Sequence, residues 1–246
     1  MAARWLSGRR RYWRPLLWTV LGLARFLGVY YGVKRVNKEA RRIQHRNNLK
    51  QIWLTLSNFN DTYEGLPPAV RRDKAGRRLC SWRFQILPFL ESWMGSPKME
   101  FGEPWDSQAN QFWAGLRIRT YCWSSEDGSP EQFHTSVVAV TGPGTPFGHD
   151  RQNRLQEMPG ATILVVEVAH SGIHWMAPED LTLDSLPDSL VHGLDGDGFH
   201  VLFADGQIWF LSPSVPLEEL QKFFTLDGAK AHDRDQVLGA YALRRR

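Results

Sequence analysis

VNKEARRIQHRNNLKQIWLTLSNFNDTYEGLPP, residues 36–68, constrains the fold more than any other segment of the sequence. No Gly or Pro interrupts it before Gly65, Pro67 and Pro68, so we expect a helix that ends at about residue 64. Its apolar side chains recur at three- and four-residue steps, which places them on one helical face: Ile43, Leu49, Ile52, Trp53, Leu56 and Phe59. Residues 34–64 are therefore predicted to form an amphipathic helix whose apolar stripe packs against the domain that follows.

The segment before this helix is apolar and lies between two basic runs. Residues 16–33 read LLWTVLGLARFLGVYYGV, and at 1.5 Å per residue they would span roughly 27 Å, close to the hydrocarbon thickness of a bilayer. Arg25 near its middle costs about 2.5–3.5 kcal/mol on insertion scales, which the Leu and aromatic content can offset. We expect a basic arm at 1–14 and a membrane helix at 15–33; an amphipathic helix lying in the membrane interface is the alternative.

Small residues in this segment are spaced for helix packing. Gly28 and Gly32 form a G-x-x-x-G pattern, which lets two helices approach closely in a membrane. Arg25 lies one turn before Gly28 and can pair with an acidic group of a partner. The pattern predicts association with similar subunits.

Charge is distributed very unevenly along the chain. Residues 1–50 hold 13 of the 30 Lys and Arg but one of the 26 Asp and Glu; the remainder has 17 basic and 25 acidic side chains, a formal charge of −8. An acidic main body argues against a nucleic-acid-binding groove, and the basic arm suits a membrane surface. The two basic flanks of the apolar segment are nearly balanced, so charge does not settle its orientation.

The rest of the chain alternates short apolar runs with turn signals. Residues 199–203 and 207–211 alternate on either side of Asp205-Gly206, which predicts a β-hairpin because Asp-Gly accepts positive φ. Further strands are expected at 135–140 and 163–168, and short helices at 82–91, 107–116 and 216–224. We therefore expect an α+β fold, with a long helix on an antiparallel sheet, a globular domain at 65–230 and a polar tail at 231–246.

Several segments together resemble a large bacterial family of pilin-like (pseudopilin-like) proteins of unknown function, also described as a putative extracellular solute-binding type. They follow the family's order: ARRIQHRNNLKQIWLTLSNFNDTYEGLPPA (40–69), SWRFQILPFLE (81–91), EPWDSQAN (103–110), TGPGTPF (141–147), ATILVVEVAHSGIHWMAPEDL (161–181) and GFHVLFADGQIWFLS (198–212). The resemblance covers about residues 36–225 and implies a pilin-like fold. The family-motif residues are Asn47, Asn48, Leu49, Trp105, Asp106, Gly142, Pro143, Gly144, Glu167, Asp205 and Gly206.

This chain departs from the family's pattern at two places. The usual leader, a Gly followed by Phe-Thr-Leu-Ile-Glu, is replaced by Pro-Leu-Leu-Trp-Thr at residues 15–19. The family's C-terminal His-x9-Asp-Gly motif has Asp195 in place of its histidine. Processing of the leader therefore stays open, and the motif histidine has no counterpart in this chain.

No set of residues predicts a reaction. Asp195 and Asp197 resemble the opening of a calcium loop, but Phe199 takes the third acidic position and no closing Glu follows, so they are weak metal candidates beside an ordinary Asp/Gly turn. His170 and His174 are four apart but follow a strand, where helical zinc-site geometry does not apply. We expect no enzyme and no cofactor.

Two further features leave alternatives open. Cys80 and Cys122 would form a disulfide on the outer side of a membrane, or remain two free thiols. Glu167 interrupts the apolar run ILVVEV; it is either paired inside the protein with a shifted pKa or directed to the solvent side of the sheet.

The function hypotheses follow from the anchor and the resemblance. In the first, the chain is a single-pass protein of the bacterial inner membrane with a periplasmic domain, and its helix joins a bundle of pseudopilin-like subunits. In the second, it is a membrane-tethered module that binds an extracellular solute or glycan through a Trp-rich surface made of Trp82, Trp93, Trp105, Trp113, Trp123 and Trp175.

Overall fold

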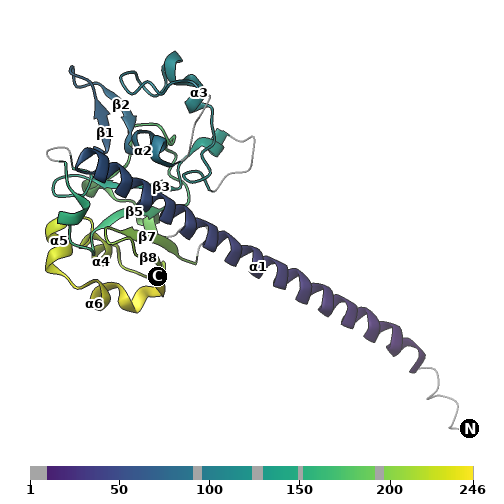
Figure 1. The fold of residues 1–246 in the computed structure, drawn as a ribbon. Coiled ribbons are helices and arrows are strands. Elements are labelled where there is room, and N and C mark those ends of the chain that lie inside the picture. The colour runs from purple at the N-terminus through teal and green to yellow at the C-terminus, as the bar shows by residue number, and fades with distance from the viewer. Residues whose placement is uncertain (1–9, 91–95, 124–129, 149–151, 192–196, 246) are drawn as a thin grey trace, which may run out of the picture. The chain divides into compact units, whose positions relative to one another are not determined.

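The computed structural model describes residues 10–90, 96–123, 130–148, 152–191 and 197–245 (Figure 1). The chain forms two compact units, residues 1–44 and residues 45–246. The division falls inside the first helix, α1 (Arg10–Tyr63), so each unit contains part of that helix. A long N-terminal helix and an α+β domain are therefore confirmed.

The predicted membrane span at 15–33 is not supported. In the part of the chain that the structure describes, no helix carries an apolar stretch long enough to cross a membrane.

The unit at 45–246 contains the remaining elements. Its α-helices after α1 are α2 (Trp82–Leu90), α3 (Gln111–Ala114), α4 (Leu217–Gln221), α5 (Leu226–Ala231) and α6 (Arg234–Leu238). Its strands are β1 (Val70–Arg72), β2 (Arg78–Ser81), β3 (Val137–Val138), β4 (Val140–Thr141), β5 (Ile163–Glu167), β6 (Leu181–Thr182), β7 (Phe199–Phe203), β8 (Ile208–Leu211) and β9 (Ala242–Arg245). Short 3-10 turns are η1 (Gln108–Asn110), η2 (Pro130–Phe133), η3 (Leu155–Glu157), η4 (Leu183–Ser185), η5 (Asp188–Val191) and η6 (Gly239–Tyr241).

A five-stranded antiparallel sheet lies at the centre of this unit, with strand order β3-β5-β7-β8-β9. The predicted hairpin is confirmed: Phe199 pairs with Leu211, and Gly206 in the turn has a φ of 79°. Two smaller pairings accompany the sheet, β1 with β2 antiparallel and β4 with β6 parallel. The parallel pair arises because the predicted strand at 135–140 is divided between β3 and β4, which join different partners.

Both faces of the sheet are covered. The predicted stripe of α1 packs on one face from Leu49 onward, where Leu49, Ile52 and Leu56 are fully buried in a cluster with α2 and with Leu202 of β7. Ile43, which was predicted to begin the stripe, is instead 47% exposed. Burying each such side chain contributes about 2 kcal/mol. The other face is covered by a cluster that includes Leu220, Phe223, Phe224 and Leu238 of the C-terminal segment, drawn in yellow in Figure 1. The sheet is consequently a buried middle layer.

The C-terminal segment differs from the expected polar tail. Residues 231–246 contain α6 and β9, and β9 extends the sheet by pairing with β8. Leu238 is fully buried, so this short basic segment contributes to the hydrophobic cluster on the face of the sheet opposite α1.

α1 ends at Tyr63, close to residue 64, where the sequence predicted its end. Glu64 takes a φ of 59°, and the Gly65 N–H donates to the carbonyl of Asn60 at 3.1 Å. A Cβ at position 65 would lie 2.5 Å from Cγ of Gln152 and 3.2 Å from the carbonyl oxygen of Asn153, so a larger residue there would require Gln152 to move.

Candidate functional site

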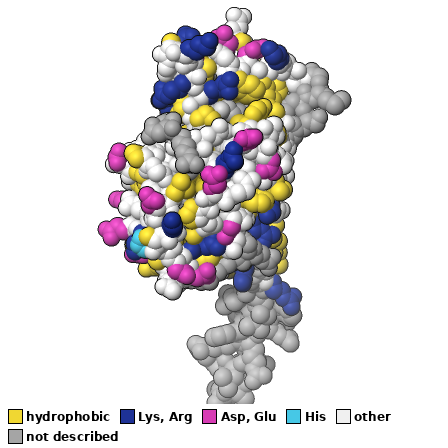
Figure 2. Space-filling model, turned by 60° about the vertical axis from the view of Figure 1, so that its left-hand side comes forward, with side chains coloured by type: hydrophobic (Ala, Val, Ile, Leu, Met, Phe, Trp, Pro, Cys, Tyr) yellow, Lys and Arg dark blue, Asp and Glu magenta, His cyan; other side chains and the backbone are white. Residues whose placement is uncertain are grey.

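The part of α1 in the first unit carries an exposed apolar surface, which we name the apolar segment, residues 26–36. Its large apolar side chains are 41% to 68% exposed: Phe26, Leu27, Val29, Tyr30, Tyr31, Val33 and Val36. Gly28 and Gly32 lie among them, and a Cβ at either position would meet nothing within 4 Å. Arg25 is exposed beside them. By contrast, hydrophobic side chains on the face of the 45–246 unit in Figure 2 are scattered among charged and neutral ones.

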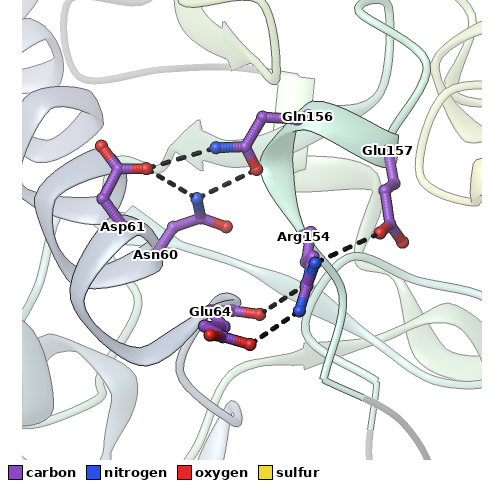
Figure 3. A pocket seen from close by; sticks show the side chains of 6 residues that line it. All are labelled: Asn60, Asp61, Glu64, Arg154, Gln156 and Glu157. Atoms are coloured by element: carbon purple, nitrogen blue, oxygen red, sulfur yellow. Dashed lines mark hydrogen bonds and ion pairs between the residues drawn. The ribbon is translucent and has the colours of Figure 1, made fainter.

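A polar pocket lies in the 45–246 unit, between the last turn of α1 and η3 (Figure 3). Its volume is about 400 Å³, and it is lined by Asn60, Asp61, Glu64, Arg154, Gln156 and Glu157. Three carboxylates and one guanidinium give this lining a formal charge of −2. The pocket is therefore suited to a polar solute that carries positive charge.

The lining side chains hold one another in place. Asn60 donates to Oε1 of Gln156 and to Oδ1 of Asp61, both at 3.1 Å, and Gln156 donates to the same Asp61 oxygen at 3.2 Å. Arg154 donates to the Glu64 carboxylate at 2.8 Å and to its carbonyl at 3.0 Å. The pocket is thus pre-formed by contacts between two segments about ninety residues apart in sequence.

A buried ionisable cluster lies beneath α1. Glu167, at the end of β5, is 2% exposed; His45 of α1 and His200 of β7 are 6% and 4% exposed. His200 contacts Oε2 of Glu167 through Nδ1, and Nδ1 of His45 lies 3.5 Å from Oε1. Burial opposes ionisation of Glu167, but its hydrogen bond with His200 and its contact with His45 outweigh burial and hold its pKa at about 2. Glu167 is therefore an ionised carboxylate inside the protein.

Comparison with known proteins assigns the chain at the level of family. A family model named SBP_bac_10, described as protein of unknown function (DUF1559), matches residues 36–170. The chain belongs to this DUF1559 family. The match includes every lining residue of the polar pocket and ends before the β7–β8 hairpin. No curated protein and no solved structure matches the chain.

Three of the expected family-motif residues of this DUF1559 member lie on α1, and they range from exposed to fully buried. Asn47 is exposed, Asn48 donates its side-chain amide to the carbonyl of Arg119 at 3.2 Å, and Leu49 is fully buried. Asn48 and Leu49 thus attach the helix to the domain.

The motif residues in the loops support turns and packing. The Trp105 ring stacks on His174 with centroids 4.5 Å apart, and Asp106 beside it is exposed. The Gly142-Pro143-Gly144 turn follows β4, and the carbonyl of Gly144 accepts the N–H of Leu226 at 2.9 Å. Asp205 forms an ion pair with Arg234 at 2.9 Å, next to Gly206 in the hairpin turn. These contacts hold the loops and the hairpin turn in place.

The two histidines that were compared with a zinc pair have different environments. His170 is exposed, whereas His174 is partly buried and accepts the Met176 N–H on Nδ1 at 3.2 Å. Its other nitrogen, Nε2, lies 3.1 Å from the carbonyl of Ala114. Burial lowers the pKa of His174 to about 4, although the Ala114 contact opposes the shift. His174 therefore holds a loop as a neutral ring.

The cysteines and tryptophans are mainly core residues. Cys80 and Cys122 are buried free thiols, and burial raises the pKa of each to about 12. Trp82, Trp113 and Trp175 are also fully buried. Three of the six rings of the proposed Trp-rich surface consequently face the interior, and Trp93 lies outside the described residues.

Asp195 and Asp197, the weak metal candidates from the sequence, are not part of the cluster of potential metal ligands that the described residues form. Asp195 lies outside the described residues. Within the described ranges, one group of at least three metal-binding side chains converges, and it is His45, Glu167 and His200 without Asp197. Glu167 was a candidate from the sequence, whereas neither histidine was. The signal was present, because His45 precedes Leu49 by four residues on the apolar stripe and so had to point into the domain.

Proposed function

We propose that this protein is a pilin-like assembly subunit in which the apolar segment packs against the same segment of other copies, while the 45–246 unit is the displayed domain. The observation that carries the proposal is the exposure of seven large apolar side chains, 41% to 68% each, on eleven consecutive residues of one helix. Contiguous apolar surface of this kind marks an interaction site on a protein.

The segment also has the shape that helix packing requires. Gly28 and Gly32 are one turn apart and have open space above them, so another helix can approach the backbone there. Val29 and Val33 follow the two glycines and are 67% and 54% exposed, so they would be among the first side chains covered. Fully burying one such side chain contributes about 1.5–3 kcal/mol.

Sedimentation velocity of the full chain over a concentration series tests the proposal. We expect wild-type protein to form oligomers and the double variant Val29→Glu, Val33→Glu to remain monomeric. The matched control is Leu54→Glu with Tyr63→Glu, since these exposed apolar residues lie on α1 outside the apolar segment; they are 48% and 55% exposed. The control should associate like wild type.

Two outcomes would overturn the assembly proposal. One is identical sedimentation of wild type and the Val29→Glu, Val33→Glu variant. The other is a wild-type monomer that cosediments with phosphatidylglycerol vesicles, because the apolar segment would then be covered by lipid rather than by another copy.

A second candidate function is solute binding, which the family name SBP suggests and the polar pocket favours. The pocket's formal charge of −2 selects a small cationic solute. Calorimetric titration with putrescine is the test: Asp61→Asn should weaken binding about tenfold, and Asp184→Asn, an exposed acid outside the pocket, should leave it unchanged. Absence of heat with wild-type protein would remove this candidate.

A further inference from the structure

Three side chains that ligate metals converge from distant parts of the 45–246 unit. His45 lies on α1, Glu167 at the end of β5, and His200 on β7. One ligand atom from each lies within 4.8 Å of the other two, and all three residues are buried. The helix and the two neighbouring central strands of the sheet therefore meet at this cluster.

At the contact between His45 and Glu167, the distance between the two ligand atoms fits two ligands of one metal ion better than it fits a hydrogen bond. Nδ1 of His45 lies 3.5 Å from Oε1 of Glu167, longer than the 2.7–3.2 Å typical of N–H···O bonds. Two atoms that each lie about 2.1 Å from one tetrahedral ion are about 3.4 Å apart. The His45–Glu167 pair thus already has the separation of two zinc ligands.

The rings are held in place by their surroundings. The His45 ring stacks on Trp123 with centroids 4.5 Å apart and an interplanar angle of 21°. Trp123 is fixed in turn by its Nε1, which donates to the carbonyl of Thr120 at 2.8 Å. The His200 ring packs on Phe210 at 4.8 Å, and its own backbone N–H donates to Oε2 of Glu167 at 3.0 Å. Ligands restrained in this way lose little conformational freedom when they bind an ion.

The types of ligand atom at this cluster indicate which metal ions it would bind. Two imidazole nitrogens and one carboxylate oxygen are typical of zinc and of other divalent transition metals, whereas calcium and magnesium prefer an all-oxygen set. A divalent ion also compensates the negative charge of a buried carboxylate. We propose that His45, Glu167 and His200 bind a divalent transition-metal ion, Zn²⁺ being the probe of choice, and that this ion fastens α1 to strands β5 and β7.

Three protein ligands leave one tetrahedral position for water or another small donor. The site does not depend on the assembly proposal, because all three ligands belong to the 45–246 unit and the apolar segment belongs to the other.

The experiment uses the full chain without a histidine tag, first dialysed against a chelator and then titrated with Zn²⁺ by calorimetry. We expect one ion per chain, visible absorption bands when Co²⁺ replaces Zn²⁺, and a rise in Tm of roughly 5 °C with excess Zn²⁺. Glu167→Gln and His200→Gln should each weaken Zn²⁺ binding more than tenfold. The matched control is His232→Gln, because His232 is exposed and its ring contacts the carbonyl of Gly228.

The proposal is overturned if wild-type protein shows no saturable Zn²⁺ binding, since the three residues would then be an ion-pair cluster only. It is equally overturned if His232→Gln weakens binding as much as His200→Gln. Should both cluster variants fail to fold, the wild-type protein decides: Co²⁺ bands in the visible support the site, and their absence refutes it.

Discussion

Acidification should weaken the fold through His174. The ring of His174 stacks on Trp105, accepts the N–H of Met176 on Nδ1 and contacts the carbonyl of Ala114 through Nε2. Because the Met176 N–H occupies the lone pair of Nδ1, a proton can bind there only if that hydrogen bond breaks. The native state therefore favours the neutral ring.

The sign and size of the effect follow from the pKa. Burial lowers the pKa of His174 from 6.5 to about 4, so between these values the unfolded chain binds a proton that the folded chain does not. The contribution is present in full above pH 6.5, falls as the pH drops from 6.5 to 4, and does not change further below 4. At 1.36 kcal/mol per unit, the loss is about 3 kcal/mol.

Guanidinium denaturation followed by Trp fluorescence at pH 7, 6, 5 and 4.5 measures this loss. His174→Gln should be less stable at pH 7 and should lose about 2.4 kcal/mol less than wild type between pH 7 and pH 4.5. His170→Gln, which changes an exposed histidine in the same loop, should follow wild type. If wild type and His174→Gln lose stability in parallel, His174 does not contribute to the acid sensitivity of the fold.

Two further substitutions test the packing of the domain. Gly206→Ala should lower the free energy of unfolding by about 1 kcal/mol more than Gly76→Ala, as measured by thermal denaturation: both glycines have φ near +80°, but a Cβ at 206 would lie 2.7 Å from the Trp53 indole, whereas one at 76 would meet nothing within 4 Å. Equal effects would contradict the close packing of α1 on this turn. Arg83→Met should cost about 3–5 kcal/mol in chemical denaturation, because it leaves the fully buried carboxylate of Asp180 without the guanidinium that lies 2.6 Å away. A change no larger than that of a surface Arg→Met substitution would show that this ion pair contributes little.

Local patterns predicted much of the fold. The stripe from Leu49 to Phe59 predicted the packed half of α1 because helical periodicity is a property of neighbouring residues. Asp205-Gly206 predicted the hairpin for the same reason, since its turn needs a residue that accepts positive φ.

Local patterns could not predict which distant segments of the chain cover each face of the sheet. The second face of the sheet is covered by α4 to α6, from a segment that we expected to be partly a polar tail. Glu167 points to the other face, where His45 of α1 lies against it and keeps it from solvent. The partners of Glu167 lie on α1 and β7, and no local spacing relates His45 to His200. The candidate metal site is therefore visible only once the chain is folded.

Oxidative cross-linking of Val29→Cys tests whether the apolar segment joins copies of this chain. The native thiols Cys80 and Cys122 should stay unreactive, because both are buried and their pKa values are raised to about 12. Val29→Cys is predicted to form disulfide-linked dimers much faster than Lys74→Cys, an exposed control in the β1–β2 turn. Equal rates of dimer formation for the two variants would show that the apolar segment does not join copies of the chain.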